Sequence, residues 1–164
     1  MLKTPLVGIL NEKRCKKTAS VIRRAAEEAP IVGIMWIAEP GRFLAAPTHT
    51  LWTQVIGKKR VWPGYAEGPR WRITLDESIY SAFSNIPFDG QKPILEACGH
   101  DGPMQPTIVF GRTCDSGDCI SEAAMLPEVK EGDWIRVQNM GAYTTVTASE
   151  FNGYETANRL YLNE

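Results

Sequence analysis

The chain has 164 residues, of which 43% are apolar, and its 18 basic and 19 acidic residues give a formal net charge of -1. This composition is ordinary for a globular protein of one or one and a half domains, and the balanced charge gives no attraction to nucleic acid or to an anionic membrane. The longest apolar stretch, residues 31–38, is far shorter than the roughly 20 residues of a membrane helix, and the first residues lack a secretory signal, so we expect a cytoplasmic protein.

The first predicted elements are a helix and a short buried strand. Between Asn11 and Ala29 the chain is rich in Lys, Arg, Ala and Glu, with an approximate helical stripe of apolar residues that Pro30 ends. The almost wholly apolar run Ile31–Ile37 is typical of a parallel strand buried on both faces, and the polar loop Glu39–Arg42 follows it. Helix, buried strand and polar loop together predict one unit of an α/β fold.

After residue 46 the sequence changes to short runs rich in Trp, Val, Ile, Thr and Tyr, separated by Gly and Pro clusters. Trp71, Ile73 and Leu75 alternate with polar residues, which is the period of a half-buried strand. We therefore divide the chain into residues 1–46 and a β domain at residues 47–164. The predicted strands of this domain are Leu51–Lys59, Trp71–Leu75, Thr107–Phe110, Trp134–Gln138 and Ala142–Ala148.

The four cysteines are expected to be free thiols, because nothing in the sequence directs the chain to an oxidising compartment. Cys98, His100, Cys114 and Cys119 lack the tight pair spacing of structural zinc ligands. The sequence therefore predicts no metal site.

The first candidate site lies in the loop after the predicted buried strand. Glu39 would stand at the carboxyl end of that strand, where α/β barrels place their active sites. Gly41 allows a close backbone approach, and Arg42 offers a forked, permanently charged donor that suits phosphate. The group suits a phosphorylated aromatic cofactor, and a capped loop with a surface ion pair is an equal alternative.

Two further candidates lie later in the chain. Cys114 and Asp115 belong to a loop rich in Gly, Ser and Asp, where a thiol beside a carboxylate suits proton donation or substrate contact better than nucleophilic attack. Tyr143, in Asn139–Tyr143, could donate a hydrogen bond to a phosphate. The bland alternatives are a turn with a buried cysteine and an aromatic ring on a sheet face.

Three motifs together carry a family resemblance. In type, order and approximate spacing they resemble the C-terminal part of the pyridoxal-phosphate-dependent ornithine, lysine, arginine and diaminopimelate decarboxylases, and within them the eukaryotic-type ornithine branch. The resemblance implies the last helix and strand of a (β/α)8 barrel followed by a C-terminal β-sandwich or barrel-like domain, in a head-to-tail dimer that shares its sites. The motifs are Ile37–Phe43, Gly111–Asp118 and Asn139–Tyr143.

The resemblance also implies roles for seven residues. Glu39 corresponds to the partner of the pyridinium nitrogen of pyridoxal phosphate, and Gly41, Arg42 and Tyr143 correspond to ligands of its phosphate. Cys114 corresponds to a cysteine that is given to the opposite subunit's site and assists protonation of the decarboxylated intermediate. Asp89 and Asp115 correspond to acids that reach the distal amine of ornithine or lysine. The Cys-Asp-Ser sequence at residues 114–116 resembles the ornithine branch, which favours ornithine over lysine and implies formation of putrescine for polyamine biosynthesis.

The sequence departs from the family at several positions. Arg112 stands where the family usually has Pro, and Leu75–Ser78 replaces a common Asp-Gly-Val-Tyr-like stretch, although Tyr80 falls near the family's tyrosine. No segment resembles the strand with the Schiff-base lysine, so we expect the isolated chain to be inactive and to need a barrel half or a homo-oligomer. The alternatives are a non-catalytic regulatory relative of the decarboxylases and a β module without an active site.

Overall fold

The computed structural model describes residues 12–28, 33, 35, 37, 39–62, 64 and 68–162. The chain forms two compact units, Met1–Glu39 and Pro40–Glu164. The predicted boundary after residue 46 falls inside the second unit, within the 3-10 turn η1 (Ala46–Thr48).

The first unit contains one described helix, α1 (Glu12–Glu28), where the sequence predicts it. The predicted strand Ile31–Ile37 lies largely outside the described residues, and its described members Gly33, Met35 and Ile37 are not in a strand. The interpretation of this region as the end of a (β/α)8 barrel therefore stays a prediction. In the part of the chain that the structure describes, no helix has the length and apolar character needed to cross a membrane.

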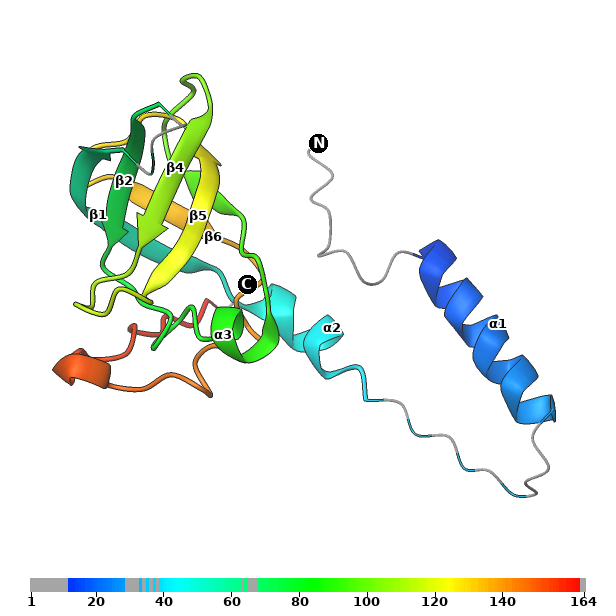
Figure 1. The fold of residues 1–164 in the computed structure, drawn as a ribbon. Coiled ribbons are helices and arrows are strands. Elements are labelled where there is room, and N and C mark those ends of the chain that lie inside the picture. Colours follow the sequence, from blue (N-terminus) through cyan, green and yellow to red (C-terminus); the bar gives the residue numbers. More distant parts are fainter. Residues whose placement is uncertain are drawn as a thin grey trace. The chain divides into compact units, whose positions relative to one another are not determined.

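The second unit is built on a six-stranded sheet that curls into a nearly closed barrel (Figure 1). The strands follow one another in the order β3-β6-β1-β2-β4-β5. Neighbours are antiparallel except for β2 and β4, which run parallel. The strands are β1 (Leu51–Val61), β2 (Arg70–Leu75), β3 (Leu95–Ala97), β4 (Gln105–Phe110), β5 (Cys119–Leu126) and β6 (Trp134–Val137).

Strand β1 is long enough to serve both halves of the barrel. Its first residues, 51–54, pair with β6, and its later residues pair with β2 after an irregularity between Val55 and Gly57. A bulge of this kind bends a strand, which lets one strand turn the corner of a closed sheet. The inward positions Leu51, Thr53 and Val55 are buried and alternate with more exposed residues, as a two-residue period requires.

The inward side chains of all the longer strands meet in one core. Ile73, Leu75, Phe83, Leu126 and Ile135 are completely buried in it. Burial of each such side chain stabilises the fold by about 1.5–3 kcal/mol. The core fixes the barrel and leaves its connecting segments free to carry polar chemistry.

Four of the five predicted strands are confirmed, and Ala142–Ala148 is wrong. This segment forms turns, because the Thr144 hydroxyl donates to the Met140 carbonyl and the Thr147 hydroxyl donates to the Tyr143 carbonyl at 3.1 Å. The predicted loop Glu39–Arg42 also needs correction, since Gly41 and Arg42 begin the short helix α2 (Gly41–Ala45).

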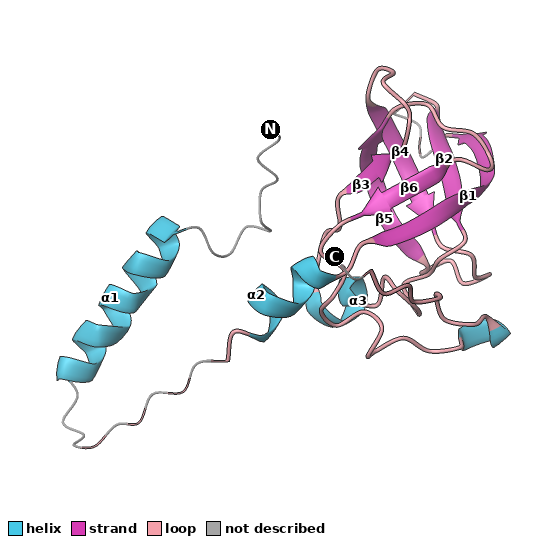
Figure 2. Cartoon of the chain, turned by 180° about the vertical axis from the view of Figure 1, so that it is seen from behind, coloured by secondary structure: helices cyan, strands magenta, loops and turns pink. Residues whose placement is uncertain are grey.

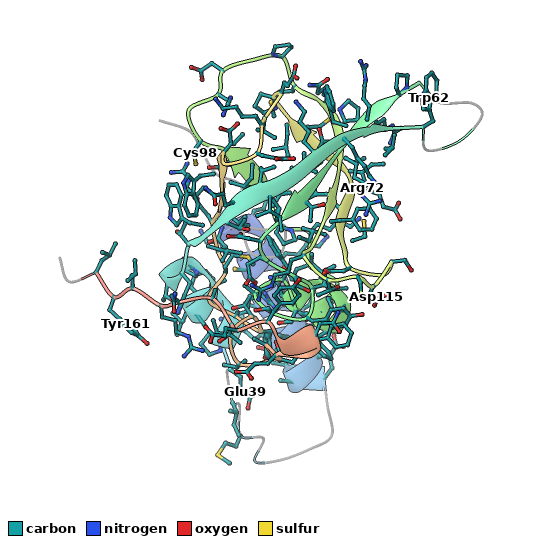
Figure 3. The ribbon with its side chains drawn as sticks, turned by 90° about the vertical axis from the view of Figure 1, so that its left-hand side faces the viewer. Glu39, Trp62, Arg72, Cys98, Asp115 and Tyr161 are labelled. Atoms are coloured by element: carbon teal, nitrogen blue, oxygen red, sulfur yellow. The ribbon has the colours of Figure 1, made fainter. Side chains whose placement is uncertain are left out.

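Connecting segments gather at one end of the barrel. In both ribbon views the short helices α2 and α3 (Asn85–Asp89) lie at this end (Figures 1 and 2). The loop between β4 and β5 reaches the same end, and Figure 3 shows its Asp115 there, with Trp62 at the opposite end of the sheet. The 3-10 turn η2 (Phe151–Gly153) contacts this loop.

Candidate functional site

Arg42 joins two of the other predicted site residues in one cluster. Its guanidinium forms an ion pair with the Asp89 carboxylate, and its Cζ lies 5.0 Å from the centre of the Tyr143 ring. Arg42 comes from α2 and Asp89 from the end of α3, and both ionic side chains are partly exposed. We call these three residues the arginine cluster.

Gly141 brings Tyr143 to this cluster. A Cβ at Gly141 would overlap the Ala45 carbonyl oxygen, and the Gly141 amide donates to the Ala46 carbonyl at 3.0 Å. The segment 140–141 therefore lies directly on the end of α2. Tyr143 itself has φ 55°, a left-handed conformation that is uncommon outside glycine and that recurs at functional sites.

A buried carboxylate organises the loop that carries the second pair of candidates. Asp118 has no exposed surface and accepts from the Ile79 amide at 3.0 Å and from the Ser78 hydroxyl at 3.0 Å. It also accepts from the Thr113 amide at 3.0 Å and from the Thr113 hydroxyl at 2.7 Å. Gly111 is needed beside it, because a Cβ there would overlap the carboxylate. The loop is thus fixed to the chain segment that follows β2.

The fixed loop, Gly111–Asp118, which we call the thiol loop, presents Cys114 and Asp115. The side-chain Nδ2 of Asn152 donates to the exposed Cys114 Sγ at 3.3 Å. Asp115 accepts from the Gly117 amide at 2.9 Å and from the Tyr80 hydroxyl. The Tyr80 ring stacks on Phe151, with 4.3 Å between the ring centres. We call Cys114, Asp115 and Tyr80 the thiol cluster.

The hydrogen bond between Tyr80 and Asp115 shifts both pKa values. The Tyr80 hydroxyl, followed by the Gly117 amide, holds the pKa of Asp115 below its ordinary value. The same hydrogen bond raises the pKa of Tyr80. Asp115 is therefore a carboxylate at neutral pH, the form that would bind a cationic amine.

The structure brings together six of the seven predicted site residues in one compact unit. Arg42, Asp89 and Tyr143 form one cluster, Cys114 and Asp115 belong to the other, and Gly41 begins the helix that carries Arg42. Glu39 is exposed and is the last residue of the first unit, so its predicted role stays a prediction.

Four residues of this region are missing from the sequence-based site. Asp118 lies inside the Gly111–Asp118 motif but carries no predicted role, and nothing in the spacing shows that it is buried. Tyr80 is close to the family tyrosine, and this proximity is the signal that could have found it. Phe151 and Asn152 follow Ala142–Ala148, which the sequence assigns to a strand. That assignment gave no reason to expect the chain to turn back here and contact Tyr80 and Cys114.

Two residues of the arginine cluster, Arg42 and Tyr143, suit the phosphate of a cofactor, which would displace the Asp89 carboxylate from Arg42. Arg42 supplies a guanidinium, and the half-exposed Tyr143 supplies a hydroxyl beside it. A Cβ at Gly41 would meet nothing within 4 Å, so no packing of this unit fills the space beside the backbone there. The donor set and the open approach therefore fit a phosphate.

The four cysteines are free thiols. Among the described residues, no group of three or more His, Cys, Asp and Glu side chains is placed to hold a metal ion.

Comparison with known proteins identifies the sheet domain. Residues 42–141 match the C-terminal sheet domain of the pyridoxal-dependent decarboxylases. The chain is 36% identical over 141 residues to ornithine decarboxylase of Mus musculus, which covers 79% of this chain and 31% of that protein. It is 36% identical over 128 residues to antizyme inhibitor 2 of Xenopus laevis, covering 73% of this chain and 28% of that one.

A solved structure agrees with this assignment. The lysine/ornithine decarboxylase of Vibrio vulnificus in complex with cadaverine has a TM-score of 0.72 and 35% identity, over 90% of this chain and 39% of that one. The chain spans about a third of the length of the curated relatives that it matches. From the matched motifs, the sheet domain and these relatives, we conclude that the chain belongs to the family of pyridoxal-dependent decarboxylases and carries its C-terminal sheet domain.

Proposed function

We propose that this chain supplies the sheet-domain residues of a pyridoxal-phosphate-dependent decarboxylase of a basic amino acid, with ornithine as the first candidate and putrescine as its product. The observation that carries the proposal is the pairing of two polar clusters at one end of one barrel, each containing residues that match the family. In the proposed enzyme the sheet domain works together with a barrel that carries the cofactor on a lysine.

Each residue has a chemical task in this proposal. Arg42 and Tyr143 bind the phosphate, Gly41 lets it approach the backbone, and Glu39 holds the proton on the ring nitrogen. The bound cofactor supplies an electron sink for the loss of carbon dioxide. In the head-to-tail dimer that the resemblance implies, Cys114 reaches the opposite subunit's site and donates a proton to the decarboxylated carbon there. The side-chain amide of Asn152 holds the Cys114 thiol in place.

The carboxylates support a substrate with a distal ammonium group. Asp115 is kept ionised by Tyr80 and Gly117 and can accept hydrogen bonds from such a group. The ion pair of Asp89 with the guanidinium of Arg42 supports a role of this carboxylate in binding a cation. Solved relatives include a lysine/ornithine decarboxylase with putrescine and with cadaverine, products with the same distal amine.

Exposed apolar side chains support a partner at this end of the molecule. Helix α2 has no buried residue and carries Phe43 and Leu44, which are 51% and 61% exposed. The C-terminal segment adds Leu160 and Leu162, each about nine-tenths exposed. Apolar surface of this kind marks a protein contact, and a cofactor-carrying barrel or a second copy of the chain would cover it.

The test is decarboxylation of ornithine by the purified chain with pyridoxal phosphate, alone and after mixing with a barrel half from a related enzyme. We expect turnover only in the mixture, and Cys114→Ala should lower kcat by about two orders of magnitude, as removal of a general acid does. Cys98→Ala is the matched control, because Cys98 directly follows β3 and lies away from Asp115 in Figure 3. Equal turnover of the Cys114→Ala mixture and the unchanged mixture would overturn the role of Cys114.

A second candidate function is a non-catalytic regulator, favoured by the similarity to antizyme inhibitor 2. A regulator needs neither the phosphate donors nor the thiol, so the presence of both clusters argues for the enzyme. Cofactor binding separates the two functions: absence of pyridoxal phosphate binding and of turnover in every mixture would favour the regulator.

A further inference from the structure

Arg112 joins three segments of the chain beside the thiol cluster. Its Nη2 donates to the Glu155 carbonyl at 2.6 Å, and its Cζ lies 4.7 Å from the centre of the Tyr154 ring. The same Nη2 lies 3.4 Å from Oε1 of the buried Glu77, and the Arg112 amide donates to the Glu77 carbonyl at 3.1 Å. One largely buried arginine thus ties the thiol loop to the end of β2 and to the C-terminal segment.

The C-terminal segment is also the part that contacts the thiol cluster from outside the loop. We call Ser149–Glu155 the clasp segment. Its Asn152 donates to Cys114 Sγ at 3.3 Å, and its Phe151 stacks on the Tyr80 ring. Its first residue, Ser149, donates to the Tyr80 carbonyl through its amide at 2.8 Å and through its hydroxyl at 3.0 Å.

The clasp segment has weak means of holding this position by itself. It contains no sheet hydrogen bonds and no fully buried side chain, and Asn152 has φ 59° inside the turn. Segments with few buried contacts open at low free energy. The two contacts of Arg112, to Glu155 and Tyr154, lie immediately after the residues that touch Cys114 and Tyr80.

We infer that Arg112 is a positioning residue for the thiol cluster: it fastens the clasp segment to the loop, so that Asn152 holds the Cys114 sulfur and Phe151 supports Tyr80. The inference rests on the proposed function for the catalytic task of Cys114, while the fastening itself rests on the contacts alone. Arginine suits this position because one planar group can donate to a carbonyl, pair with a carboxylate and stack on a ring. Proline, usual at this place in the family, offers none of these contacts and no amide donor for the Glu77 carbonyl.

Amide hydrogen exchange of the whole chain tests the fastening. In Arg112→Ala we expect exchange of the clasp segment to be about tenfold faster, as loss of a charge-assisted hydrogen bond implies, while strands β4 and β5 keep their rates. Arg136→Ala is the matched control, because Arg136 also pairs with a glutamate, Glu96, at 2.6 Å, on the β6–β3 side of the sheet. Unchanged exchange of the clasp segment in Arg112→Ala overturns the inference.

If Arg112→Ala fails to fold, Arg112→Lys tests the same contacts. Lysine keeps the charge beside Glu77 but cannot stack on Tyr154 and reach the Glu155 carbonyl with one rigid plane. We expect exchange of the clasp segment to be faster than in the unchanged chain and slower than in a free, unstructured peptide with the sequence of Ser149–Glu155. A rate equal to that of the unchanged chain contradicts the role of the guanidinium.

A kinetic measurement distinguishes positioning from a merely structural role. In the reconstituted decarboxylase, Arg112→Ala should lower kcat about tenfold with a nearly unchanged KM for ornithine, because Asp115 keeps its bond to the Gly117 amide inside the loop while Cys114 loses Asn152. Arg112→Lys should recover part of kcat. A rise in KM with kcat unchanged overturns the assignment to the thiol. The proposed function fails separately, if Cys114→Ala turns over normally while the clasp segment still opens in Arg112→Ala.

Discussion

The two clusters at the end of the barrel are held in different ways. The thiol cluster stands on Asp118, a carboxylate without exposed surface that accepts four hydrogen bonds from the loop and from the segment after β2. The arginine cluster consists of a partly exposed ion pair and a ring contact. One cluster is fixed by the fold, and the other is held by charges that an incoming anion or ammonium group can exchange.

This difference matches the tasks that we propose. A proton donor must stand at a set position, and burial of Asp118 provides that position in the isolated chain. A phosphate site must open to receive its ligand. Arg42 and Asp89 neutralise each other in a partly exposed ion pair, which a phosphate and an ammonium group can separate by binding one side chain each. Substitutions in the two regions should therefore have unequal effects on stability.

The largest effect should come from Asp118→Asn. The NH2 group of the asparagine is a donor and would face the donors of Ser78, Ile79 and Thr113. Buried polar groups would then be left unpaired, at a cost of about 3 kcal/mol. Urea unfolding measures the loss. The exposed Asp101, changed to Asn, is the matched control. Equal stability of the two variants would mean that Asp118 does not organise the loop.

Gly141→Ala should come next, with a loss of about 2 kcal/mol, since the new methyl group would overlap the Ala45 carbonyl and force the backbone apart. Gly41→Ala makes the same chemical change where the Cβ meets nothing, so its stability should not fall. Thermal unfolding compares the two. In the reconstituted enzyme Gly41→Ala should still weaken cofactor binding, and a stable variant with normal affinity would remove Gly41 from the phosphate site.

Asp89→Asn should change stability by less than about 1 kcal/mol, because its ion pair with Arg42 is partly exposed. The difference should shrink further at high salt, which screens exposed charges. Chemical unfolding at low and high salt gives both values. A loss as large as that of Asp118→Asn would show that the arginine cluster is as firmly built as the thiol cluster.

Glu77 should give a pH dependence without a large effect at any one pH. Burial, only partly offset by the Ala82 amide and by Arg112, raises its pKa above the ordinary 4.5. The folded protein thus binds this proton more tightly than the unfolded chain does. The resulting stability is fully present below the ordinary pKa and is lost as the pH rises through the raised pKa.

Unfolding of the unchanged chain and of Glu77→Gln across this pH window measures the contribution. The stability of the unchanged chain relative to Glu77→Gln should fall as the pH rises. Glu128 provides the contrast, because Lys58 lowers its pKa. The stability of the unchanged chain relative to Glu128→Gln should therefore rise as the pH rises. A pH-independent difference for Glu77 would contradict its raised pKa.

Parts of the fold follow from local sequence. Trp71–Leu75 alternates and contains β-branched and aromatic residues, and it forms β2 as predicted. Strand β5, with the sequence CISEAAML, does not alternate and has one β-branched residue, Ile120, and no aromatic one. It is a strand because β4 pairs with it. Thr144 and Thr147 have strand propensity but use their hydroxyls to hold a turn, so Ala142–Ala148 could not be assigned from composition.

The sequence by itself determined the family, the β character of residues after 46 and six of the residues that meet at the end of the barrel, because motif chemistry and two-residue periodicity are local properties of the chain. Only the tertiary structure decided that Arg42 pairs with Asp89, that Tyr80 and Asn152 hold the thiol loop, and that Asp118 is buried. These are contacts between segments far apart in sequence, and their energies depend on burial, which no local pattern contains.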